Sequence, residues 1–78
     1  MSRKIKLIWD FRGPDAHETA KHHVIQLEEF AVKENLVFHG TGVEQTSEWM
    51  CAAYISVNEE DMIIYRDALK PHRGLVDR

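Results

Sequence analysis

Apolar side chains alternate with polar ones at the start of the chain. They occupy every second position: Ile5, Leu7, Trp9 and Phe11. A period of two residues is typical of a β-strand with one buried face. Gly13 and Pro14 follow, and neither favours a continuing strand. We therefore expect a strand over residues 4–11 that ends in a turn.

From residue 16 to about residue 34 the apolar positions follow the period of a helix. At 100° per residue, a stripe about 120° wide collects Ala16, Ala20, His23, Val24, Leu27, Phe30 and Ala31. We expect this stripe to face the sheet and Asp15 to cap the helix. Ile25 and Val32 fall on nearly the opposite side, either as ordinary exposed apolar surface or as part of an interface.

The second half of the chain predicts a hairpin and a shorter helix. Residues 36–44 and 49–57 are its two arms, joined near residues 45–47. Gly40 and Gly42 in the first arm suit a bulge or close packing, and would equally let a ligand approach the backbone.

Asn58 is suited to cap a helix that runs from residue 59 to about residue 70, where Pro71 would stop it. Residues 72–78 would add at most a very short strand.

This order predicts an α+β fold, a ferredoxin-like two-layer sandwich with the plan βαββα and its fourth strand short or absent. Both helices would cover one face of an antiparallel sheet, and residues 1–78 would form one small domain. The resemblance is one of topology and indicates no function. The first strand would keep an open edge, so we expect a homodimer that pairs these edges or stacks the uncovered sheet faces.

Charge narrows the choice of partners. Ten Lys and Arg stand against thirteen Asp and Glu, a net charge of −3, which argues against nucleic acid as a partner. Both ends are nevertheless basic: residues 1–12 hold four basic side chains against one acidic, and residues 68–78 hold three against one. If these ends lie close together, they could form a small anion-binding patch, although we expect the basic side chains at both ends to be simply solvated.

The compartment follows from cysteine usage and from the lengths of the apolar runs. The lone Cys51 cannot form an internal disulfide, which favours a reducing environment. No apolar run approaches the roughly 20 residues that span a bilayer. The first residues lack the apolar core of a secretory signal, so we expect none. We expect a cytoplasmic protein without membrane contact.

Five histidines raise the question of a metal site. His17 and His22 resemble the H-E-x-x-H zinc motif, but they are five positions apart instead of four. On a regular helix their imidazoles diverge by about 140°, so they cannot share one tetrahedral ion. His23 lies on the core-facing stripe, where we expect a buried and hydrogen-bonded side chain. We therefore predict neither a metal nor another cofactor.

His39, Cys51 and Tyr54 are the candidate ligand-binding residues. His39 and Cys51 would face each other across the hairpin, although a register shift of one residue would place them on opposite faces. Cys51 also has apolar neighbours, which suits a buried thiol. No catalytic residue is assigned, because a Cys-His pair would also need an orienting group and an oxyanion hole, and the sequence shows neither.

Two functions remain open. The first is a non-enzymatic binding or interaction module that acts as a homodimer, with a small molecule or a protein as further partner. The alternative is a small dimeric ferredoxin-like enzyme or metal-handling protein that uses a pocket of His39, Cys51 and Tyr54. Whether these three side chains line one cavity distinguishes the two.

Overall fold

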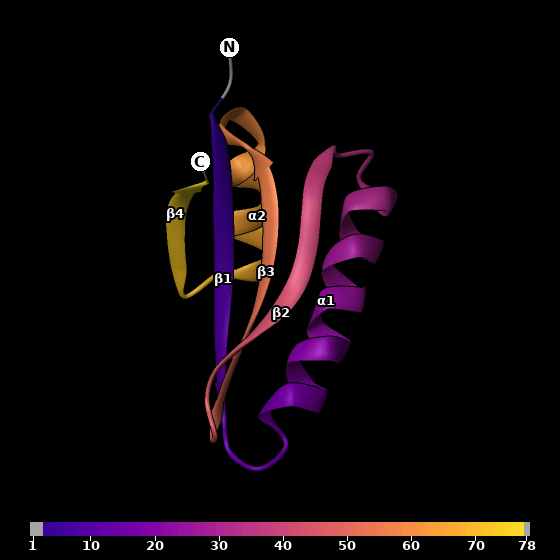
Figure 1. Ribbon diagram of the computed structural model, residues 1–78. Helices are drawn as coiled ribbons and strands as arrows, with labels where there is room; N and C mark the ends of the chain where they lie inside the picture. Colours follow the sequence, from indigo (N-terminus) through magenta and orange to yellow (C-terminus); the bar gives the residue numbers. More distant parts are fainter. Residues whose placement is uncertain (1–2, 78) are drawn as a thin grey trace.

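The computed structural model describes residues 3–77. They form one antiparallel sheet of four strands and two α-helices, in an α+β arrangement (Figure 1). The elements along the chain are β1 (Lys4–Arg12), α1 (Ala16–Lys33), β2 (Phe38–Ser47), β3 (Met50–Asn58), the 3-10 turn η1 (Glu59–Asp61), α2 (Met62–Leu69) and β4 (Arg73–Asp77). The strand order is β2-β3-β1-β4, which places the two most apolar strands in the centre.

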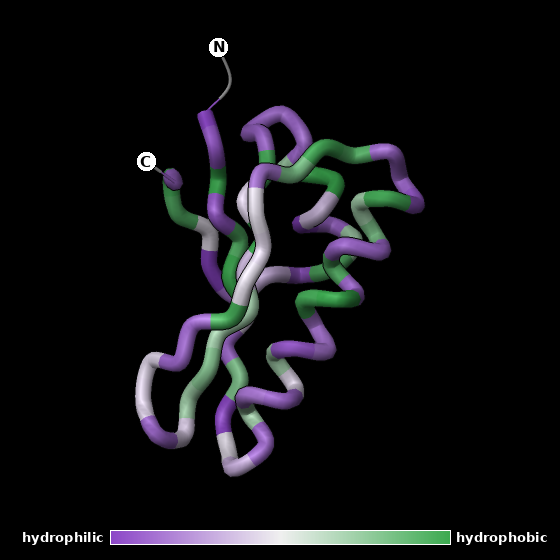
Figure 2. The backbone as a smooth tube through the Cα atoms, turned by 45° about the vertical axis from the view of Figure 1, so that its right-hand side comes forward, coloured by the Kyte–Doolittle hydropathy of each residue, from purple (hydrophilic) through white to green (hydrophobic). Residues whose placement is uncertain are grey.

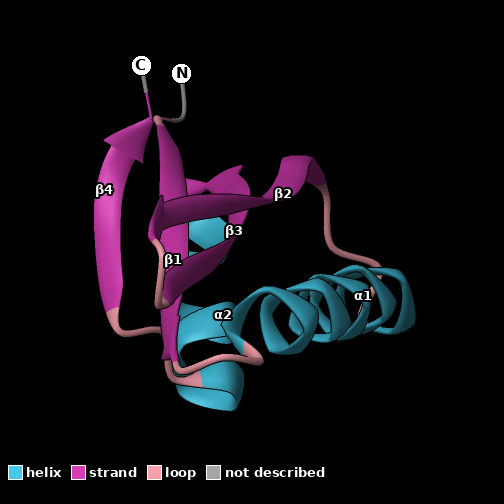
Figure 3. Cartoon of the chain, turned by 60° about the horizontal axis from the view of Figure 1, so that its bottom comes forward, coloured by secondary structure: helices cyan, strands magenta, loops and turns pink. Residues whose placement is uncertain are grey.

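The expected ferredoxin-like βαββα plan is wrong. A fourth strand is present, because β4 pairs antiparallel with residues 4–8 of β1 and covers that edge (Figure 3). The helices also do not form a layer of two equivalent members, since α1 buries four residues and α2 buries only Tyr65. β4 was not predicted as a full strand, because it is an edge strand that is exposed on both faces. Such a strand lacks the alternation of apolar and polar residues that marks a half-buried strand.

The core lies on one face of the sheet. Ile5, Leu7 and Trp9 of β1 are at most 6% exposed, which confirms the buried face predicted from their spacing. They pack against buried side chains of β3, α1 and α2, which are Ile55, Val57, Leu27, Ala31 and Tyr65. The indole Nε1 of Trp9 donates to the carbonyl oxygen of Leu69 at 2.8 Å. This hydrogen bond ties the end of α2 to the central strand.

Helix α1 presents its small and apolar residues to the sheet, and Figure 2 shows polar and apolar segments alternating along it. Gly13, at a positive φ of 109°, makes the turn before the helix, a backbone conformation that side chains disfavour. Asp15 precedes the helix but makes no side-chain cap, so the expected cap is wrong. Ile25 and Val32 are 53% and 72% exposed on the outer side.

His23 packs beside two aromatic rings, with its ring centroid 4.9 Å from that of Trp9 and 5.4 Å from that of Phe11. Its Nε2 is buried and has no hydrogen-bond partner within residues 3–77, so this nitrogen departs from the hydrogen-bonded side chain that we expected. Burial lowers the pKa of this imidazole, which favours its neutral form.

The β2–β3 hairpin turns at residues 48–49, beyond the expected joint. Two irregularities interrupt its ladder, one between Phe38 and Gly40 and one between Gln45 and Ser47. At Gly42 the glycine is required by packing, because a Cβ there would lie 2.6 Å from the hydroxyl oxygen of Tyr54. These features match the bulge and close-packing explanations for the two glycines.

Helix α2 ends at Leu69, where Lys70 adopts a left-handed conformation with φ at 51° and Pro71 follows. A left-handed residue followed by proline is a common helix stop. The chain then reverses into β4. Within the described residues, no helix has the length and apolar character needed to cross a bilayer.

Candidate functional site

The structure places the three candidate ligand-binding residues in three different environments. His39 lies on β2, where its Nε2 donates to the side-chain oxygen of Asn58 at 2.6 Å. Asn58 thus holds His39 and makes no side-chain cap for the following turn, contrary to expectation. Cys51 pairs with Gln45, and the pairing near His39 involves Ser56 instead. The expected proximity of His39 and Cys51 is wrong, because the hairpin turns later than its composition indicated.

Cys51 belongs to the core. It is 2% exposed and packs with the small residues Ala16, Ala20 and Ala53. Burial raises the pKa of its thiol, which keeps the sulfur protonated and weakens it as a nucleophile or metal ligand. This environment is that of a small apolar side chain.

Tyr54 lies on the opposite, open face of the sheet. Its ring crosses Gly42 on β2, and the Lys6 ammonium nitrogen lies 4.2 Å from the ring centroid. Lys6 also forms an ion pair with Glu44. Tyr54, Lys6 and Glu44 form a cluster that connects β1, β2 and β3, so Tyr54 contributes to the packing of the sheet. A ligand-binding role for Tyr54 stays a prediction.

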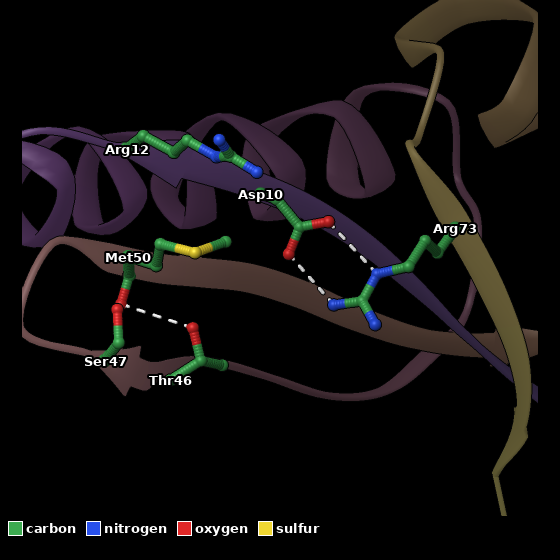
Figure 4. A pocket seen from close by; sticks show the side chains of 6 residues that line it. All are labelled: Asp10, Arg12, Thr46, Ser47, Met50 and Arg73. Atoms are coloured by element: carbon green, nitrogen blue, oxygen red, sulfur yellow. Dashed lines mark hydrogen bonds and ion pairs between the residues drawn. The ribbon is translucent and has the colours of Figure 1, made fainter.

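A hollow of about 390 Å³ occupies one corner of the same open face. Four strands supply its lining: Asp10, Arg12, Thr46, Ser47, Met50 and Arg73 (Figure 4). The register explains why these side chains meet, since Met50 is the partner of both Arg12 and Ser47. Asp10 and Arg12 are two positions apart on β1 and therefore point to the same side.

The hollow forms where one strand is shorter than its neighbour. β4 begins with Arg73 opposite Ile8, whereas β1 continues to Arg12. On the β4 side of β1, no strand among residues 3–77 pairs with this stretch, whereas β3 pairs with it on the other side. Instead, the backbone N–H of Asp10 donates to Nδ1 of His72 at 2.9 Å, so a side chain takes the place of a ladder partner.

Asp10 fixes Arg73 by a two-point contact. Nε and Nη2 of Arg73 donate to the two carboxylate oxygens of Asp10 at 3.0 and 2.9 Å. This geometry holds the guanidinium plane in one orientation at the rim of the hollow. The pair is formally neutral, so its charges largely cancel within the hollow.

Arg12 is the uncompensated charge of the site. Within residues 3–77 it makes no hydrogen bond or ion pair, and in the view of Figure 4 its guanidinium extends toward the side chain of Asp10. Ser47 Oγ accepts from the Trp49 backbone N–H at 3.4 Å, which leaves its own hydrogen for another acceptor. Thr46 Oγ1 donates to the Met50 carbonyl oxygen at 3.4 Å.

These groups together suit an oxyanion. Arg12 offers a full set of guanidinium donors, Arg73 retains those not used by Asp10, and Ser47 adds a hydroxyl. The Met50 side chain supplies an apolar surface beside them. Each guanidinium group can donate charge-assisted hydrogen bonds to a carboxylate or phosphate group.

Within the part of the chain that the structure describes, no three histidine, cysteine, aspartate or glutamate side chains are grouped so that they could hold a metal ion. Comparisons of the chain with protein-family models, with curated proteins and with solved structures gave no match. The geometry of the open face is therefore the basis for a functional proposal.

One feature of the amino-acid sequence pointed to this site. Both ends of the chain are basic, and the pairing of β4 with β1 does bring the two basic segments side by side. It did not indicate Asp10, Thr46, Ser47 or Met50 as site residues. They come together only through the register of the strands, which local sequence patterns do not specify.

Proposed function

We propose that the protein is a non-enzymatic binding module that holds a small ligand by its carboxylate or phosphate group in the hollow on the open face. One observation carries this proposal: Arg12 has no partner among the described residues and lines the same hollow as Arg73, which Asp10 holds in place. Two guanidinium groups against one carboxylate leave the hollow with an excess positive charge.

Binding is favoured over catalysis by the residues that line the hollow. None of the six is a histidine or a cysteine, and the one carboxylate is occupied by Arg73. The alternative, an enzyme or metal-handling protein with a pocket of His39, Cys51 and Tyr54, would need side chains that the fold keeps apart. The lone cysteine supports a reducing and hence cytoplasmic location, which is also part of the proposal.

The proposal is tested by titrating the ¹⁵N-labelled protein with inorganic phosphate and, separately, with succinate, and following the amide shifts. We expect the amide chemical shifts of residues that line the hollow to change. The anion that binds with the lower dissociation constant identifies the preferred group, phosphate or carboxylate. Arg12→Gln should weaken binding about tenfold or more, the equivalent of one charge-assisted hydrogen bond.

Arg66→Gln is the matched control, because Arg66 is an exposed arginine of α2 outside the hollow. It should bind both anions as the parent protein does. Equal losses in the two variants would show unspecific charge attraction. Unchanged amide shifts at the hollow up to about 50 mM of either anion, weaker than any specific site, would overturn the proposal.

A further inference from the structure

The two edges of the sheet differ in how well they are protected against pairing with another strand. β2 is interrupted by two bulge-like irregularities, and bulges are a common device that keeps an edge from pairing. β4 pairs with β1 without interruption, and its other edge is the end of the sheet. The three central residues of β4 carry no charge, and Leu75 and Val76 are 51% and 43% exposed.

The sequence of β4 is complementary to itself. In an antiparallel pair of two β4 strands centred on Leu75, this leucine faces the partner's Leu75, and Arg73 faces the partner's Asp77. Gly74 then faces the partner's Val76, so a residue without a side chain meets a branched one. Opposite charges and apolar pairs directly across a ladder both stabilise it.

The charged residues have hydrogen-bonding capacity left for this contact. Arg73 uses Nε and one hydrogen of Nη2 for Asp10, which leaves Nη1 for this contact and the second Nη2 hydrogen for an anion in the hollow. Asp77 accepts from the Ser56 hydroxyl through Oδ2 at 2.6 Å, which leaves Oδ1. The contact between two copies therefore breaks no hydrogen bond within either copy.

From this complementarity we propose that the protein forms a homodimer in which the β4 strands of two copies pair antiparallel about a twofold axis at Leu75. The two sheets become one continuous sheet. This interface differs from the one expected from the sequence, because β4 already covers the β1 edge and the open face already buries Ile8 to 5% exposure. A pairing of five residues per strand is small, so we expect a dissociation constant of about micromolar or weaker.

Sedimentation equilibrium over a range up to about 200 µM tests the dimer, with the parent chain expected to approach twice 9.1 kDa. In Leu75→Glu the new carboxylate lies opposite Lys6 within one copy, which suits the monomer, but opposite an equal charge in the dimer. We expect dimerisation to weaken about tenfold or more. Val32→Glu, at an exposed position of α1, is the matched control and should dimerise as the parent chain does.

Oxidation of Leu75→Cys gives a second readout that does not depend on the strength of the dimer. Directly opposed residues of an antiparallel pair have Cα atoms about 4.5–5.5 Å apart, within the range that a disulfide spans. We expect a cross-linked dimer from Leu75→Cys and none from Val32→Cys, while the native Cys51 is buried.

A parent chain that stays monomeric throughout would overturn the proposal. So would a dimer that tolerates Leu75→Glu, or cross-linking through Val32→Cys alone. A failure of the dimer leaves Arg12 and the Asp10–Arg73 pair of one copy in place, so it does not overturn the proposed anion site.

Discussion

The two faces of the sheet exclude water by different means. On the covered face, Leu7 and Ile55 are at most 2% exposed beneath the helices, and the contacts are apolar. On the open face, Ile8 and Ala52 are nearly as well buried, at 5% and 3%, although no helix lies over them. Long polar side chains cover this face with their apolar stems and hold each other by cross-strand ion pairs. The first face supplies stability, and the second carries the charged groups of the proposed anion site.

The largest effect is expected on the covered face, from Leu27→Ala. Leu27 is fully buried between α1 and the sheet, so truncation removes apolar contacts and leaves a cavity. We expect the free energy of unfolding to fall by about 2–5 kcal/mol in urea titrations. Val32→Ala, at an exposed position of the same helix, should change it by less than about 0.5 kcal/mol. Equal effects would mean that the faces of α1 are wrongly assigned.

Gly42→Ala tests whether the open face is also closely packed. The new methyl group would lie 2.6 Å from the Tyr54 hydroxyl oxygen, so the ring must leave its place beside Lys6. We expect a loss of about 1–3 kcal/mol in unfolding free energy, the usual range for overpacking. In the background of Tyr54→Ala the same substitution should cost much less. An additive double mutant would show that the two residues do not interact.

The sequence predicted the covered face far better than the open one. The alternation of Ile5, Leu7 and Trp9 and the stripe on α1 are local periodic patterns, and burial on one side produces them directly. Asp10 and Arg73 are 63 positions apart, and their ion pair depends on the register of β4 against β1. β4 itself has no half-buried pattern. The hairpin turns at residues 48–49, next to a register irregularity that its composition does not locate. Sites built from cross-strand pairs therefore stay hidden from local patterns.

Tyr65→Phe examines a polar atom inside the apolar face. Tyr65 is fully buried, and its hydroxyl has no hydrogen-bond partner among residues 3–77. A buried hydroxyl without a partner is unfavourable, so we expect the variant to be as stable as the parent or more stable by about 1 kcal/mol at neutral pH. A loss of more than about 1 kcal/mol would show that the hydroxyl does bond in solution.

The same residue gives a pH dependence. Burial, with a smaller contribution from the Asp61 carboxylate, raises the pKa of Tyr65 to about 12. In the unfolded chain the phenol ionises near pH 10, so between about pH 10 and pH 12 ionisation favours unfolding. The parent protein should therefore lose stability more steeply than Tyr65→Phe as the pH rises through this range. Denaturant midpoints at several alkaline pH values measure the difference, and parallel curves would contradict it.

The smallest effect on stability is expected from Asp10→Asn. This substitution on the open face should change phosphate binding more than the free energy of unfolding. The Asp10 and Arg73 side chains are 26% and 50% exposed, so loss of their ion pair should lower the unfolding free energy by less than about 1 kcal/mol. The affinity for phosphate, in contrast, should rise. Without the negative charge, the hollow gains positive charge. Arg73 also regains one donor, because the amide nitrogen of asparagine cannot accept, so phosphate should bind more tightly. Asp67→Asn removes the same charge from an exposed pair on α2 and should leave phosphate affinity unchanged. If Asp10→Asn binds phosphate more weakly than Asp67→Asn, the carboxylate is needed to hold Arg73 in place, and the open face owes its binding to that geometry more than to its charge.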